Sequence, residues 1–78
     1  MTDPHTTYHA RIDDESGDVL VLVRLRTAAG STYGERYQLG EGWVEDARAF
    51  DVMLNGQDYD LLDEDEAEDL AGRIEDQA

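Results

Sequence analysis

Residues 18–27 read DVLVLVRLRT, and this stretch constrains the fold more than any other part of the chain. It is rich in β-branched residues, and its first half is apolar at successive positions. A strand with two apolar faces belongs inside a sheet, because both of its faces need cover. The stretch therefore predicts the middle strand of a sheet.

Two neighbouring stretches predict the strands beside it. YHARID, residues 8–13, alternates between apolar and polar side chains, which is the period of a strand. TYGERYQL, residues 32–39, reads as a third strand, although Glu35 interrupts its apolar parity. The turns DESGD and AAGS separate the three strands, so we expect an antiparallel meander. Its inward face would carry Tyr8, Ile12, Val21, Val23, Leu25, Tyr37 and Leu39.

Segment 46–61 allows two interpretations. As a helix, it begins with Asp46 as the cap and ends before Gly56, with an apolar stripe made of Ala47, Phe50 and Leu54. As a hairpin, it turns at the Asn-Gly pair, the strongest two-residue turn signal in a sequence. The hairpin would set Asp51 opposite Asp60, and like charges are unfavourable there. The helix is favoured, and the hairpin stays an alternative.

The acidic stretch 63–76 predicts a second helix. Asp63 suits the N-cap, and Glu66 three residues later completes a capping box. Asp69 and Arg73 lie four residues apart and can pair. Helical spacing also gives one apolar stripe, consisting of Ala67, Leu70, Ala71 and Ile74.

Together these elements predict an α+β fold, with a three-stranded antiparallel β-meander and two short helices packed on one face (β-β-β-α-α). The 78 residues would form one small acidic domain, 1–78, whose residues 1–6 are a flexible N-terminus. Trp43, between the sheet and the first helix, is expected to close the small core.

Composition narrows the classes of function. The chain has no Cys, which excludes disulfides, thiol catalysis and cysteine metal sites. It has no apolar run long enough for a membrane span and no signal-peptide pattern, so we expect a cytoplasmic protein without membrane contact. The net charge of −14 would repel polyanions, which argues against direct binding of nucleic acid. A GC-rich genome or a salt-rich cytoplasm would explain such acidity without any specific partner.

Patterns that support enzymatic or metal chemistry are lacking. The carboxylates do not have EF-hand spacing, and His5 and His9 form no metal-binding motif. GEGW lacks the spacing of a phosphate-binding loop, and Ser16 and Ser31 lie in turns without a base beside them. We therefore expect no catalytic residues, no cofactor and no metal.

The second half of the chain carries most of the charge. Residues 40–78 hold 14 acidic residues and two Arg, and eight of the 14 positions in 63–76 are acidic. On a helix this is one charge per about 2.6 Å, compared with about 1.7 Å along duplex DNA. Such a face is either an ordinary solvated surface or a partner-binding face that mimics DNA, made of Glu64, Asp65, Glu68, Asp69, Glu75 and Asp76.

A second candidate surface lies on the outward parity of the predicted sheet. It would combine apolar and positive side chains, a mixture found at protein interfaces, from Arg11, Leu20, Leu22, Arg24, Arg26 and Arg36. This face could bind a protein partner or support a homodimer. Alternatively, its arginines only balance nearby acids such as Asp13 and Glu35.

The sequence thus predicts a small acidic, non-enzymatic protein-interaction module. It would be an accessory or regulatory factor, for which a phage or mobile element is one candidate source. The alternative function is a DNA mimic that inhibits a nucleic-acid-binding protein through the acidic C-terminal helix.

Overall fold

The computed structural model describes residues 5–77. Its strands are β1 (His5–Ile12), β2 (Val19–Ala28), β3 (Ser31–Gln38), β4 (Gly42–Glu45) and β5 (Asp60–Leu62). Three helical segments separate the last two strands: the 3-10 helix η1 (Ala47–Phe50), α1 (Asp51–Asn55) and the 3-10 helix η2 (Gly56–Asp58). The chain then forms the long helix α2 (Glu64–Gln77). The predicted α+β class is confirmed.

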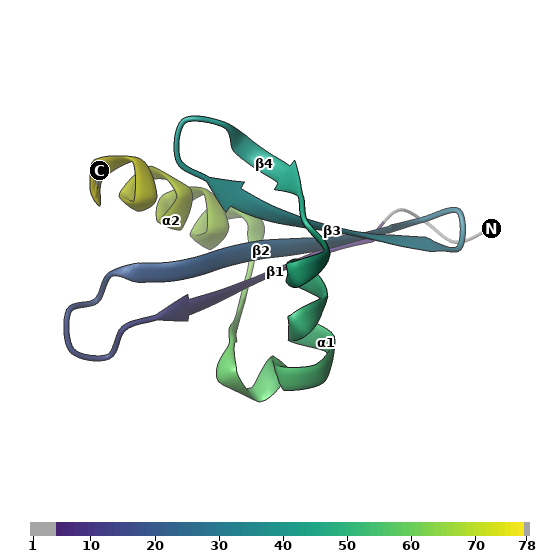
Figure 1. Ribbon diagram of the computed structural model, residues 1–78, viewed down its shortest axis with the longest axis horizontal. Coiled ribbons are helices and arrows are strands. Elements are labelled where there is room, and N and C mark those ends of the chain that lie inside the picture. Colours follow the sequence, from purple (N-terminus) through teal and green to yellow (C-terminus); the bar gives the residue numbers. More distant parts are fainter. Residues whose placement is uncertain (1–4, 78) are drawn as a thin grey trace.

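One antiparallel sheet contains five strands in the order β4-β3-β2-β1-β5. The strands β1 to β4 are labelled in Figure 1. β2 is the central strand, as its apolar sequence predicts. The expectation of only three strands is wrong, because β4 and β5 add one strand at each edge. These edge strands have four and three residues, which is too short for a period of two to be recognised.

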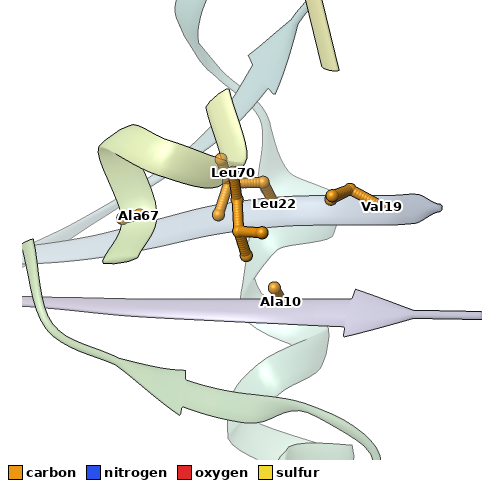
Figure 2. Close-up of a cluster of buried hydrophobic side chains, with 5 residues drawn as sticks. All are labelled: Ala10, Val19, Leu22, Ala67 and Leu70. Atoms are coloured by element: carbon orange, nitrogen blue, oxygen red, sulfur yellow. The ribbon is translucent and has the colours of Figure 1, made fainter. Parts of the chain in front are cut away.

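The two faces of the sheet are covered by different helices (Figure 1). On the α2 face, Leu22 packs with Ala10 of β1 and with Leu70 of the helix (Figure 2). On the α1 face, Val23 packs with Ala49 and Val52. The expectation that both helices share one face is therefore wrong. Because successive side chains of β2 point to opposite faces, this strand supplies a core to each helix.

The structure also corrects the predicted inward face. Tyr8, Ile12 and Tyr37 pack in the α2 cluster, whereas Val21 and Leu25 pack in the α1 cluster. The cause is register: Tyr8 pairs with Arg24, so it shares a face with the even-numbered residues of β2. A shift of one residue moves every side chain of a strand to the other face.

Segment 46–61 is helical over residues 47–58, as favoured, and the hairpin is excluded. Asp46 caps η1 by accepting a hydrogen bond from the Arg48 backbone N–H at 2.9 Å. The predicted apolar stripe is wrong: Ala47 and Leu54 are exposed, and Ala49 and Val52 are buried instead.

The N-cap and the apolar stripe predicted for α2 are confirmed, whereas the capping box forms only in part, because within residues 5–77 no hydrogen bond joins the Asp63 N–H to the Glu66 side chain. Asp63 accepts a hydrogen bond from the Glu66 N–H at 2.8 Å, and the stripe Ala67, Leu70, Ala71 and Ile74 packs in the α2 cluster. The proposed pair between Asp69 and Arg73 does not form, because Arg73 donates to the Gly17 carbonyl at 2.6 Å. This contact ties the helix to the β1–β2 turn.

The N-terminal end of the domain differs in detail from expectation. Residues 5 and 6, predicted to be flexible, belong to β1, and residues 1–4 lie outside the described residues.

Trp43 packs against the α2 cluster and contacts Tyr8 and Tyr37, in agreement with its expected role in the core. Within residues 5–77, no helix has the length and apolar character that a membrane crossing requires.

Candidate partner-binding surfaces

The predicted sheet face does not exist as one surface. Arg24 and Arg26 lie on the α2 face, opposite Tyr8 and Thr6 of β1. Leu22 shares that parity and is 1% exposed, so it belongs to the core. The other two predicted arginines, Arg11 and Arg36, are paired with Val21 and Val23 on the α1 face. The expectation of one shared face is wrong, and the formation of a homodimer stays a prediction without this surface.

Two of these arginines are engaged by one carboxylate, as the charge-balancing alternative expects. Arg24 binds Glu35 through Nε at 3.0 Å and Nη2 at 3.2 Å, and Arg26 binds it at 2.9 Å. The hydrogen bonds of Arg24, with the charges of both arginines, lower the pKa of Glu35. Arg24 also lies over the Trp43 ring at 4.5 Å. These contacts give both arginines a structural role.

The predicted acidic face is present on the exposed side of α2. Glu64, Asp65, Glu68 and Asp69 are exposed, and none forms an ion pair within the described part of the chain. Glu75 differs, since it accepts hydrogen bonds from the Tyr37 hydroxyl at 2.8 Å and the Gly40 N–H at 3.3 Å. The last predicted member, Asp76, is exposed near the end of the helix. Glu75 therefore fastens α2 to the sheet.

A groove that the sequence did not predict lies between the sheet and the segment η1–α1. Its volume is about 540 Å³, which is within the usual range for ligand sites. The wall is largely apolar, with contributions from Val21, Val23, Ala47, Phe50, Leu54 and Tyr59. Arg36, Arg48 and Asp51 are its charged members. We call this the α1 groove.

Gly34 explains why η1 can lie so close to the sheet. It is a buried residue of β3, and a Cβ added there would stand 3.0 Å from the Ala49 Cβ and 3.3 Å from Phe50. The Gly34 carbonyl also accepts a hydrogen bond from the Asp46 N–H at 3.0 Å. A glycine inside a strand is a signal for such a close approach, so Gly34 is the sequence feature that could have indicated this packing.

Most charged groups of the α1 groove already have partners. Arg48 binds Asp46 at 2.9 Å, and its hydrogen bonds lower the pKa of that carboxyl group. Asp51 accepts hydrogen bonds from the Tyr59 hydroxyl at 2.9 Å and from Asn55 at 2.7 Å. Burial, followed by the bond to Asp51, raises the pKa of Tyr59. Arg36 is the exception, since no hydrogen bond or ion pair of its guanidinium occurs within residues 5–77.

A slot continues the α1 groove between β2 and β3. The ladder between these strands starts at the Val23–Arg36 pair, although β2 begins at Val19 and β3 ends at Gln38. The slot has a volume of about 270 Å³ and is lined by Val19–Leu22, by residues 36–39, by Arg48 and by Ile74 of α2. It shares Val21, Arg36 and Arg48 with the groove, so Arg36 lies where the two hollows meet.

The predicted residue Leu20 also lines the slot and is 54% exposed. Three apolar side chains on the α1 side are more exposed than Leu20. Leu54 at the rim of the groove is 85% exposed, Met53 beside it is 66% exposed, and Leu61 of β5 is 71% exposed. Such exposure often marks an interaction site on a small protein.

Within residues 5–77, no three side chains of His, Asp or Glu are grouped as metal ligands would be. Comparison of the chain with models of protein families, with curated proteins and with solved structures found no match. The function is therefore inferred from the α1 groove and the charged surfaces.

Proposed function

We propose that this protein is a small, non-enzymatic protein-interaction module, an accessory or regulatory factor, that binds its partner through the α1 groove. The observation that carries the proposal is the composition of this site. An open apolar hollow with exposed Leu54 at its rim is bordered by arginines, on a protein of net charge −14.

The distribution of charge supports a specific surface. Arg36 and Arg48 line the groove, and Arg11 lies 5.9 Å from the Tyr59 ring at its wall. Half of the six arginines of the chain are thus near one hollow, although acidic residues dominate the rest of the molecule. Arginine and aromatic side chains are enriched at the centres of protein interfaces. The combination favours a protein partner.

Affinity capture from a lysate of the source cells tests this proposal. The wild-type bait is compared with Leu54→Ser, which removes an exposed apolar side chain and leaves the core untouched. A third bait carries Glu64→Gln, Asp65→Asn, Glu68→Gln and Asp69→Asn on α2. We expect the third bait to capture the same partner as the wild type, and Leu54→Ser to lose it. Retention by Leu54→Ser would contradict binding in the groove.

The acidic face of α2 supports a second candidate, the DNA mimic. Its four exposed carboxylates, Glu64, Asp65, Glu68 and Asp69, have no ion-pair partner in residues 5–77 and so remain available to cations of another protein. A mimic would bind a nucleic-acid-binding protein, and its binding would fall steeply with salt. Loss of capture by the third bait, together with competition by DNA or heparin, would favour this function over the first.

A further inference from the structure

Arg36 is a half-buried cation that forms no ion pair and no side-chain hydrogen bond in the described part of the chain. Its cross-strand neighbours explain this isolation, since it faces Val23 on β2 and Val44 on β4. The positive charge of Arg36 lowers the pKa of Asp46, but Arg48 holds that carboxylate with three side-chain hydrogen bonds of 2.9–3.2 Å. Arg36 therefore remains available to a group from outside the domain.

The surroundings of Arg36 define the chemistry of that group. The apolar wall of the α1 groove lies on one side, and the slot between β2 and β3 lies on the other. A carboxylate fits the planar guanidinium, and a pair formed in a partly desolvated hollow is stronger than one in water. The high net negative charge disfavours polyanions in general. A ligand with one carboxylate beside an apolar anchor satisfies both conditions.

The slot also offers backbone groups. Residues 19–22 of β2 pair with β1 on one side but have no ladder partner in β3 on the other. Within residues 5–77, the bond from the Val19 N–H to the Gln77 side chain is the only side-chain hydrogen bond made by their backbone. A strand side without a partner, next to a side-chain pocket, offers the backbone groups by which sheets bind extended peptides. In an extended segment, side chains one or two residues apart lie about 3–7 Å from each other along the chain.

We propose that the α1 groove binds an extended segment of a partner protein in which an apolar side chain lies about one or two residues from an Asp or Glu. The apolar side chain enters the groove beside Val21, Phe50 and Tyr59, and the carboxylate pairs with Arg36. This inference rests on the proposed function and names the chemistry that the partner must present.

Selection from a random-peptide phage library on the immobilised protein tests the carboxylate. We expect the wild type to enrich peptides with an apolar residue close to an acidic one. Arg36→Gln should lose the acidic preference, Arg36→Lys should keep it, and Arg36→Glu should enrich Lys or Arg at that position. The matched control is Arg26→Gln, which removes the same charge from the α2 face and should leave the preference unchanged.

A synthetic peptide of the enriched sequence then gives the size of the effect. Replacing its Asp by Asn should weaken binding to the wild type on the order of 10- to 100-fold, the usual range for losing a charge-assisted hydrogen bond. Binding to Arg36→Gln should be the same for both peptides, because the interaction partner is gone. An acidic preference that survives in Arg36→Gln, or the absence of any enriched peptide, would overturn the inference.

Leu54→Ser separates this inference from the proposed function. If Leu54→Ser abolishes peptide binding and Arg36→Gln does not, the groove is the binding site but the carboxylate is not recognised. If neither variant changes binding, both proposals fail. Sedimentation of the free protein tests whether a second copy of the chain occupies the groove. A dimer that Leu54→Ser converts to a monomer would show that it does, and this result would also overturn the inference.

Discussion

Replacing Leu22 by alanine is expected to destabilise the protein strongly, and the matched replacement of Leu20 is not. Leu22 is 1% exposed and packs between β1 and α2, whereas Leu20, two residues earlier on the same strand, is 54% exposed. A buried Leu→Ala change costs about 2–5 kcal/mol, because apolar contact is lost and a cavity remains. For Leu20, of which about half stays in water, the cost should be about 1 kcal/mol or less.

These costs are large for a chain of 78 residues, whose free energy of unfolding is expected to be about 4–12 kcal/mol. The melting temperature of Leu22→Ala should fall by about 8–40 °C, since each kcal/mol shifts a domain of this size by about 4–8 °C. Urea unfolding followed by the fluorescence of Trp43, which packs against the same cluster, measures both variants. Equal losses for Leu22→Ala and Leu20→Ala would refute the burial of Leu22 beneath α2.

Three further variants test other parts of the structure. Gly34→Ala should cost about 1–3 kcal/mol in urea unfolding, because its Cβ would meet the Ala49 Cβ at 3.0 Å; an unchanged stability would contradict the packing of η1 on β3. Ala29→Asn should add up to about 1 kcal/mol, because Ala29 has a φ of 53° in the turn before Gly30, and Asn tolerates that conformation better; a lower melting temperature would speak against this turn. Glu35→Gln tests a pH dependence. The hydrogen bond from Arg24 lowers the pKa of Glu35 in the folded protein below its ordinary value of 4.5. The ion pair therefore stabilises the fold above about pH 4.5, and this stabilisation is lost as the pH falls through the lower folded-state pKa. The stability difference between wild type and Glu35→Gln should thus be constant near neutral pH and shrink below about pH 4.5, and a difference that is the same at every pH would rule out the ion pair as its source.

Local sequence signals predicted α2 correctly. The cap at Asp63 and the stripe from Ala67 to Ile74 lie within one turn or along one face of a single helix, so no distant residue is needed to recognise them. The three longer strands were also predicted from their own residues, with boundaries that differ by up to three positions. The edge strands β4 and β5 were missed. These short segments become strands because they pair with β3 and β1, and their own sequences show no strand pattern.

The candidate sites were predicted less well than the elements. The exposed acidic residues of α2 lie where the helical period placed them, but the four arginines of the predicted sheet face are divided between two faces. Phe50 and Leu54 were assigned to a core stripe, and the structure places both in the wall of the α1 groove. The smaller residues Ala49 and Val52 take the core positions because Gly34 lets η1 approach the sheet closely.

The sequence by itself therefore determined the α+β class, the central position of β2 and the charged, exposed face of α2. Each of these follows from periodicity or composition within one segment. The tertiary structure alone decided which face of β2 each helix covers, because the register of β1 against β2 depends on distant packing and a shift of one residue reverses it. The tertiary structure also decided the place of Arg36. The β2–β3 ladder stops at the Val23–Arg36 pair, and this leaves Arg36 beside an apolar groove, without an ion pair within residues 5–77.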